Sequence, residues 1–246
     1  MHNAAFAQLG LDWLYVKLPV SPVLFEETVR ALPSSGFRGA NVTIPHKVAA
    51  LALADRATDA ARGVGAANTL SFADDGAIEA DNTDAGGFLE ALGIAPRGRT
   101  ALVLGAGGAA RAVAWALREE GAARVAVWNR TSERAQILAR DLGVDHVDRP
   151  GSADIVVNAT SLGLDPGLEP GDAIAALGLH GLDPPAFVVD LVYAPGVTPV
   201  LAWGEKAGAR LVDGLEVLVR QGSRSFERWT GRTPPLEVMR AAVRGD

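Results

Sequence analysis

The segment Leu102-Val103-Leu104-Gly105-Ala106-Gly107-Gly108-Ala109-Ala110-Arg111 decides which fold the sequence predicts. An apolar run leads into a glycine-rich turn and then a helical pattern, which is the order of a dinucleotide-binding β-turn-α unit. In such a unit Gly105 permits the tight turn, and Gly107 lets the backbone approach a diphosphate. The diphosphate meets free N–H groups at the positive end of the helix dipole. The expected pyrophosphate-binding residues are Gly105, Ala106, Gly107, Gly108 and Ala109.

Short apolar runs alternate with helical patterns through the rest of this region. The expected strands are Thr100–Leu104, Arg124–Trp128, Ile155–Val157 and Phe187–Asp190, and the expected helices are Gly107–Glu120 and Ser132–Leu142. Strands separated by helices predict right-handed crossovers and a parallel sheet. This order favours a nucleotide-binding domain over an ordinary β-turn-α connection. The fold class is therefore α/β, with a Rossmann-like doubly wound parallel sheet.

The segment after the second of these strands indicates which nucleotide binds. An NAD site carries Asp or Glu there, accepting from the ribose 2′-hydroxyl. This chain instead has Asn129-Arg130-Thr131-Ser132-Glu133-Arg134, with no carboxylate at the decisive position. A guanidinium can bind two phosphate oxygens at once. We expect NADP(H) to be preferred over NAD(H), the alternative being that Arg130 and Arg134 form a solvated helix face.

The N-terminal region has a second α/β pattern. A strand is expected at Arg38–Ile44, with Pro45 in the first turn of the next helix, and a hairpin at Ala67–Phe72 and Ala77–Ala80. A helix is expected at Thr83–Leu92. The pattern breaks at residues 95–99, so we place a domain boundary between residues 97 and 98. The chain is expected to be helical again from Leu215. The aromatic side chains of Phe226 and Trp229 in that helix are expected to pack against another part of the protein.

Composition excludes several classes of function. The chain has 246 residues, enough for two modest domains, with no cysteine and four scattered histidines. No metal site is expected from this set. A net charge of −6 argues against a nucleic-acid partner. No apolar run is long enough for a membrane helix and no signal peptide is evident, so the sequence predicts a cytoplasmic protein.

Opposite charges lie in two polar clusters of the N-terminal region. Lys47 follows the expected strand, and Asp84 opens the expected helix after the hairpin. Reduction of a ketone requires a proton on oxygen, which a lysine ammonium beside a carboxylate can deliver. Neutral groups such as Thr43 and Asn68 suit a ligand with several hydroxyls. From the residues alone, a surface lysine and a helix-capping aspartate are an equally good interpretation.

The motifs together resemble the shikimate dehydrogenase family over essentially the whole chain. In the N-terminal region they are NVTIPHK (41–47), GAANT (65–69) and DNTDAGG (81–87). In the remainder they are GAGGAARA (105–112), NRTSERA (129–135), Asn158–Ser161, Asp190–Pro195, Asp213–Leu215, Gln221–Gly222, Phe226 and Trp229–Gly231. This resemblance, rather than the composition, is what indicates the substrate. It implies NADPH-dependent reduction of 3-dehydroshikimate to shikimate.

The resemblance also implies the role of individual residues. Lys47 is expected to be the general acid/base, paired with Asp84. The expected substrate ligands are Thr43, Asn68, Asp84, Tyr193 and Gln221. The expected NADP ligands, besides the glycine turn, are Asp59, Asn129, Arg130, Thr131, Ser132, Glu133, Arg134, Leu191 and Gly214. The implied domains are a substrate-binding domain at 1–97, completed by helices at 215–246, and an NADP-binding domain at 98–214. Phe226 and Trp229 of those helices are expected to pack onto the N-terminal region. A homodimer is compatible with the family.

The sequence departs from the family at its start. The family has an N-terminal strand and a serine-containing loop, and Met1-His2-Asn3 lies inside the stretch that ends that loop. Either a longer chain exists or this is a paralogue with a weakened substrate site, and the retention of Lys47, Asp84 and both nucleotide motifs favours the first. For the short chain we expect intact NADP binding and a raised KM for shikimate.

Three other functions are compatible with parts of the pattern. A quinate/shikimate dehydrogenase or related paralogue differs only in its substrate profile, and the 129–134 segment argues against an NAD-preferring form. A non-catalytic NADP-binding protein would bind the nucleotide without turnover. A folate-linked methylene dehydrogenase has a similar two-domain plan, but the NVTIPHK and DNTD motifs argue against it.

Overall fold

The computed structural model describes residues 1–163, 169–193 and 196–245. Ala194 and Pro195 of the 190–195 motif lie outside these residues. The chain forms two compact units, one of Met1–Gly87 with Leu218–Asp246 and the other of Phe88–Val217. The units therefore divide within a helix, ahead of the boundary expected between residues 97 and 98. No helix in the described part of the chain is long and apolar enough to cross a membrane.

The Phe88–Val217 unit contains a six-stranded sheet in the order β10-β9-β8-β5-β6-β7. Its strands are β5 (Thr100–Leu104), β6 (Arg124–Trp128), β7 (Asp145–His146), β8 (Ile155–Asn158), β9 (Phe187–Asp190) and β10 (Arg210–Val212). All neighbouring pairs are parallel. The strand order reverses between β5 and β8, as in a doubly wound sheet, which confirms the expected fold class.

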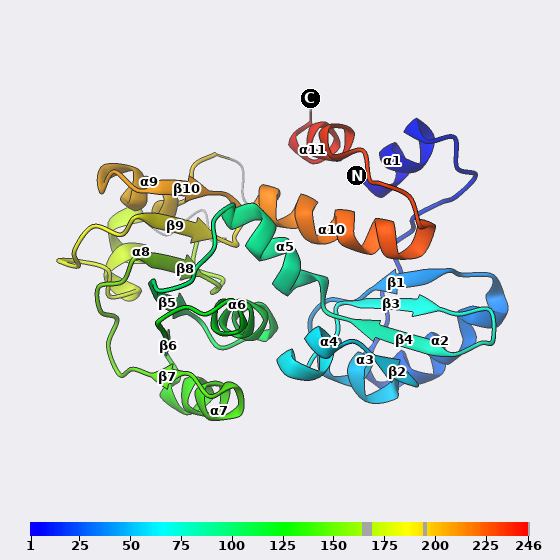
Figure 1. Ribbon diagram of the computed structural model, residues 1–246, viewed down its shortest axis with the longest axis horizontal. Helices are drawn as coiled ribbons and strands as arrows, with labels where there is room; N and C mark the ends of the chain where they lie inside the picture. Colours follow the sequence, from blue (N-terminus) through cyan, green and yellow to red (C-terminus); the bar gives the residue numbers. More distant parts are fainter. Residues whose placement is uncertain (164–168, 194–195, 246) are drawn as a thin grey trace. The chain divides into compact units, whose positions relative to one another are not determined.

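Helices cover both faces of this sheet because its strands are apolar on both sides. They are α6 (Gly108–Glu119), α7 (Ser132–Leu142), α8 (Pro170–Ala176) and α9 (Pro199–Lys206). Figure 1 shows α6 and α7 beside β5 to β7, and α8 and α9 beside β8 to β10. On the α8–α9 face, Leu102, Val156 and Val188 of the sheet share one core with Ile174 and Val200.

The other unit contains a four-stranded sheet in the order β1-β3-β4-β2. Its strands are β1 (Gly39–Asn41), β2 (Arg56–Ala57), β3 (Thr69–Phe72) and β4 (Ile78–Asp81). Strands β3 and β4 are antiparallel, which confirms the expected hairpin. The helical segments of this part are η1 (Pro22–Leu24), α2 (Phe25–Ala31), η2 (Pro33–Ser35), α3 (Lys47–Leu53), α4 (Asp59–Val64) and α5 (Thr83–Leu92), the last of which continues into the second unit.

The segment between β1 and α3 differs from its expected structure. The strand expected at Arg38–Ile44 ends at Asn41, and Pro45 precedes the helix instead of occupying its first turn. The reason is a turn in which the N–H of His46 donates to the carbonyl of Thr43 at 2.9 Å. The Ile44–Pro45 peptide bond within that turn is cis. Lys47 is thereby the first residue of α3.

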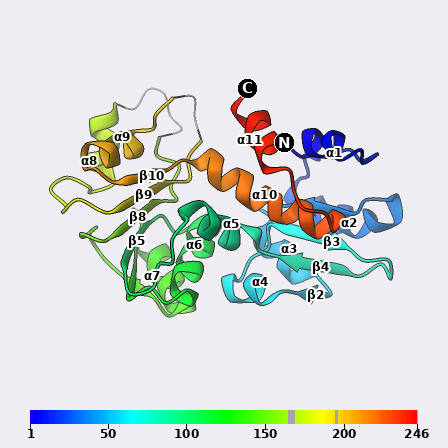
Figure 2. The same ribbon diagram turned by 45° about the horizontal axis from the view of Figure 1, so that its top comes forward.

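The C-terminal helices complete the four-stranded unit. They are the second half of α10 (Gly214–Thr230) and α11 (Leu236–Arg244), which pack with α1 (His2–Gln8). Phe226 is fully buried in that cluster, and the indole N–H of Trp229 donates to the carbonyl of Leu70 at 2.9 Å. Figure 2 shows this part of α10 on one side of the small sheet, with α3 and α4 on the other. The expectation that Phe226 and Trp229 pack onto the N-terminal region is confirmed.

Candidate active site

Lys47 and Asp84 form an ion pair between the starts of two helices. Lys47 opens α3, and Asp84 lies in the first turn of α5. The ammonium Nζ donates to Oδ2 of Asp84 at 2.6 Å, and the two side chains are 15% and 20% exposed. The positive end of the α5 dipole favours a carboxylate at this position. The partial exposure leaves the pair accessible to a ligand, as a proton donor must be.

Asn68 supports Asp84 from the buried side. Its Nδ2 donates to Oδ1 of Asp84 at 2.8 Å and to Oε1 of Gln221 at 3.3 Å. The Asp84 carboxylate thus accepts one hydrogen bond on each oxygen. The structure therefore brings together four of the residues that the sequence singled out: Lys47, Asn68, Asp84 and Gln221.

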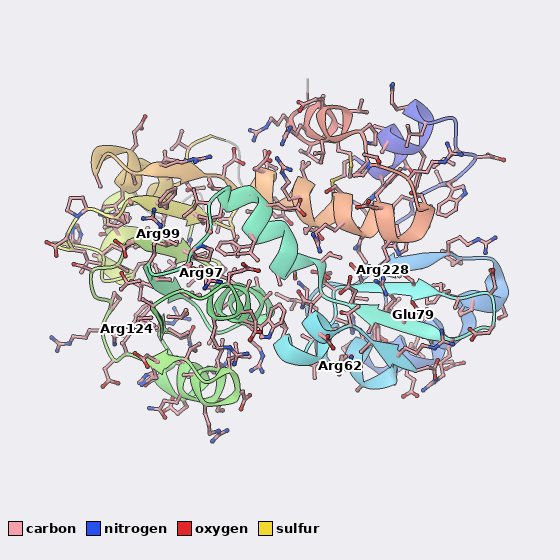
Figure 3. All side chains as sticks on the ribbon, in the orientation of Figure 1. Arg62, Glu79, Arg97, Arg99, Arg124 and Arg228 are labelled. Carbon is pink, nitrogen blue, oxygen red and sulfur yellow. The ribbon has the colours of Figure 1, made fainter. Side chains whose placement is uncertain are left out.

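Gln221 reaches this cluster because α10 packs very closely on α5. A Cβ at Gly87 would lie 2.5 Å from the backbone nitrogen of Gln221, and one at Gly86 would lie 2.5 Å from the Arg224 guanidinium. Only residues without side chains permit this approach. Two helical turns after Gln221, Arg228 holds α10 on the sheet through Glu79 of β4 at 3.4 Å, a pair labelled in Figure 3.

Two expected substrate ligands lie at exposed positions. Thr43 is exposed in the turn that precedes α3, in the same unit as Lys47. Tyr193 follows β9 in the other unit, and its side chain is 56% exposed. Neither hydroxyl has a hydrogen-bond partner that ties it to the protein interior among the described residues. Both are free to meet a ligand.

The glycine turn after β5 has the geometry of a pyrophosphate cradle. Gly105 has φ +114°, and a Cβ there would lie 2.8 Å from the carbonyl oxygen of Ala159. Gly107 caps the twelve-residue helix α6 in an extended conformation, and the place of its missing Cβ is open space. A diphosphate can therefore approach the first N–H groups of α6, so these residues fit a dinucleotide.

The segment after β6 fits a phosphate group. Asn129 fixes the turn by donating to the carbonyl of Thr131 at 2.8 Å, and Ser132 begins α7. Arg130 and Arg134 are exposed and have no carboxylate partner in the described part of the chain. Two guanidinium groups near one helix start, without a counter-ion, suit the 2′-phosphate of NADP.

The segment after β9 is held by a buried carboxylate. Asp190 is fully buried and accepts from Asn158 at 2.8 Å, from the N–H of Val192 at 3.0 Å and from Thr198 at 2.6 Å. Burial raises the pKa of Asp190, although these hydrogen bonds oppose the rise. A Cβ at Gly214 would lie 2.8 Å from the carbonyl of Leu191. Leu191 and Gly214, which the sequence assigned together, are thus neighbours.

Asp59 is at the surface. Its side chain is 97% exposed and pairs with Arg62 one turn further along α4. Its expected role near the nucleotide stays a prediction. Within the described residues no group of three or more acidic or histidine side chains is arranged to hold a metal ion.

Three family models match the chain in succession. The shikimate dehydrogenase substrate binding domain matches residues 1–70, the shikimate / quinate 5-dehydrogenase model 91–191, and the shikimate 5′-dehydrogenase C-terminal domain 214–244. The shikimate dehydrogenase (NADP(+)) of Citrifermentans bemidjiense is 44% identical over 262 residues, covering 99% of this chain and 88% of that protein. The chain belongs to the shikimate dehydrogenase family.

Solved structures with the shikimate dehydrogenase fold are similar to this chain over nearly its full length. Shikimate 5-dehydrogenase from Thermus thermophilus, in complex with NADP(H) and shikimate, gives a TM-score of 0.86 at 38% identity, covering 99% of this chain and 92% of that one. The 5-ketofructose reductase of Gluconobacter sp. strain CHM43 gives 0.87 at 31% identity, covering 99% and 91%. The same fold thus occurs in a relative whose name gives a different ketone substrate.

Reasoning from the sequence assigned no role to four buried polar residues within the shikimate dehydrogenase motifs. Thr69 and Thr83 are buried beside Asn68, and Asn158 and Asp190 are buried beside each other. Thr69, Asn158 and Asp190 lie within or directly after a strand that the sequence predicted, and Thr83 begins a predicted helix. A polar residue at such a buried position was the available signal, because a buried polar group requires partners.

Proposed function

We propose that this chain catalyses the NADPH-dependent reduction of 3-dehydroshikimate to shikimate, and the reverse oxidation. The observation that carries the proposal is the Lys47–Asp84 pair in a chain of this family. The pair is partly exposed, and Asn68 donates to the Asp84 carboxylate. A ketone being reduced needs a proton at oxygen, and the Lys47 ammonium is the acid of this pair that can supply it. Asp84 keeps the ammonium in place by accepting from it.

The polyhydroxylated ring binds to the Asp84 carboxylate and to neutral donors and acceptors around the pair. We assign Asn68, Asp84 and Gln221 to its hydroxyl and carbonyl groups, together with Thr43 and Tyr193. Amide and hydroxyl side chains serve such a ligand because each can both donate and accept. In the reverse reaction, neutral Lys47 accepts the proton of the shikimate alcohol.

The NADP site is assigned to the other unit. NADPH, when bound, supplies the hydride that reduces the ketone carbon. The pyrophosphate is assigned to Gly105–Ala109 at the start of α6, and the 2′-phosphate to Asn129–Arg134. Leu191 and Gly214 line the nicotinamide side. Asp59, which belongs to the Met1–Gly87 unit, is assigned as a further nucleotide contact. In functional terms residues 1–97 with 215–246 form the substrate-binding domain, and residues 98–214 the NADP-binding domain. A cytoplasmic location and a homodimer are part of the same proposal.

The test is substrate-dependent formation of NADPH by the purified chain, followed by absorbance. Shikimate with NADP is expected to give the highest kcat/KM among four combinations of shikimate or quinate with NADP or NAD. In the reductive direction, 5-ketofructose is expected to be a poor substrate beside 3-dehydroshikimate. A preference for quinate or 5-ketofructose would replace the proposed substrate. Nucleotide binding without turnover of any of them would indicate a non-catalytic protein.

A further inference from the structure

The side-chain amide of Asn68 lies at the centre of a buried hydrogen-bond network. The proposed reaction gives the other members of this network no role. Asn68 is 3% exposed, and Thr69 and Thr83 beside it are 0% and 1% exposed. The Oδ1 atom of Asn68 accepts from the backbone N–H of Thr83 at 2.7 Å. The hydroxyls of Thr69 and Thr83 each lie 3.2 Å from the same Oδ1 atom. The Thr83 hydroxyl also accepts from Nδ2 of Asn68 at 3.0 Å. The backbone N–H of Thr83 and the two threonine hydroxyls therefore hold the Asn68 carboxamide at both of its ends.

This arrangement fixes which end of the carboxamide faces Asp84. A backbone N–H can only donate, so the oxygen of Asn68 must face Thr83 and the NH2 group must face Asp84. The Thr69 hydroxyl accepts from Nδ2 of Asn41 at 3.2 Å, which leaves its own proton for Asn68 or for the Thr83 hydroxyl 3.0 Å away. The helix cap is a separate group, because Asn82 accepts from the N–H of Ala85 at 3.3 Å. The two threonine hydroxyls thus act on Asn68 and not on the start of α5.

We propose that Thr69 and Thr83 are positioning residues for proton transfer, whose hydroxyl groups, together with the Thr83 backbone N–H, hold the Asn68 carboxamide so that it keeps Asp84 as the acceptor for the Lys47 ammonium. The inference rests on the proposed function, because it concerns the same proton. If the amide turned over, its oxygen would face the Asp84 carboxylate, and two acceptors cannot share a hydrogen bond. Asp84 would then lose the partner that fixes its second oxygen, and Lys47 would lose its fixed position.

The test replaces each hydroxyl by a methyl group of the same shape. In Thr69→Val and Thr83→Val we expect kcat for shikimate to fall about tenfold, because Asn68 then holds the Lys47–Asp84 pair less well for proton transfer. The KM for NADP should stay unchanged, because neither threonine belongs to the nucleotide-binding unit. Thr69→Ser and Thr83→Ser retain the hydroxyl and should restore most of kcat. The pH profile of kcat should shift in the valine variants only.

The matched control is Thr230→Val, in the same unit, whose hydroxyl donates to the carbonyl of Phe226 at 2.8 Å. This variant should lose some stability and keep its kcat. If the folded Val variants of Thr69 and Thr83 keep kcat within about twofold of the unchanged chain, or if the Ser variants restore nothing, the positioning role is refuted. Should Thr83→Val fail to fold, the kcat of Thr69→Val alone tests the positioning role.

A second readout does not depend on activity. The side-chain NH2 group of Asn68, assigned in a ¹⁵N-resolved NMR spectrum by its absence in Asn68→Ala, should exchange slowly with solvent in the unchanged chain. In Thr69→Val and Thr83→Val we expect this signal to broaden or to exchange faster. An unaltered signal would overturn the inference. If the chain does not oxidise shikimate at all, the proposed function fails, while this measurement still judges the orientation of Asn68.

Discussion

At the scale of single residues, the chemistry depends on the Lys47 ammonium. Lys47→Ala removes the proposed proton donor and leaves Asp84 bonded to Asn68, so we expect kcat to fall by about 10²–10⁴ with a smaller change in the KM for shikimate. Steady-state kinetics of shikimate oxidation measure both. The control is Lys17→Ala, an exposed lysine of the same unit. Equal losses in the two variants would remove Lys47 from the mechanism.

Two glycines of one turn have different roles that substitution can separate. Gly105→Ala places a Cβ against Ala159 at positive φ, so the free energy of unfolding should fall by about 1–3 kcal/mol or more. Gly107→Ala places its Cβ in open space at negative φ, so stability should change by less than about 0.5 kcal/mol.

Gly107→Ala should weaken nucleotide binding although it leaves stability nearly unchanged. The added methyl group stands where the diphosphate must approach the α6 N–H groups, so the Kd for NADP should rise at least about tenfold. Urea unfolding and titration calorimetry measure the two quantities. Unchanged NADP affinity in Gly107→Ala would argue against the cradle.

At the scale of elements, the start of α7 is expected to select the cofactor. Replacing Arg130 and Arg134 together by Ala removes two charge-assisted contacts to the 2′-phosphate, so kcat/KM with NADPH should fall about 10–100-fold. The value with NADH should change little, because NADH has no such phosphate. Arg140→Ala, another exposed arginine of α7, is the control. A parallel loss with both cofactors would contradict the assignment.

At the scale of the whole molecule, stability should depend on pH through His2. Burial against aromatic side chains lowers the pKa of His2 from 6.5 to about 4. Between pH 6.5 and pH 4, His2 therefore binds a proton in the unfolded chain but not in the folded chain. The free energy of unfolding consequently falls as the pH falls. The full effect is present above pH 6.5. The loss by pH 4 is up to roughly 3 kcal/mol at 1.36 kcal/mol per unit.

The measurement compares the chain with His2→Phe, which keeps an aromatic ring without a titratable group. Its free energy of unfolding in urea should fall less between pH 7 and pH 4.5 than that of the unchanged chain. Identical slopes would mean that His2 titrates normally. The buried Asp190 acts in the opposite direction, because its raised pKa makes ionisation costly in the folded state as the pH rises. The comparison cancels that contribution.

The sequence by itself determined the elements and the residue types of the site. Alternation of apolar runs with helical patterns predicted β5, β6, β9 and α7 with the bounds observed, because these elements are amphipathic or wholly apolar over their length. The glycine turn and the polar clusters after strands also follow from local patterns. Pro45 was misplaced, since a proline fits a turn before a helix as well as the first turn within it.

The tertiary structure alone decided which polar residues meet. Lys47, Asn68, Asp84 and Gln221 come from four separate segments, and their contact depends on the small sheet and on the close packing of α10 against Gly87. No local pattern encodes that approach. The orientation of the Asn68 amide likewise depends on Thr83, which is fifteen residues away in sequence and fully buried. Buried hydrogen bonds are satisfied by whichever groups the fold brings near, and this information is absent from any single segment.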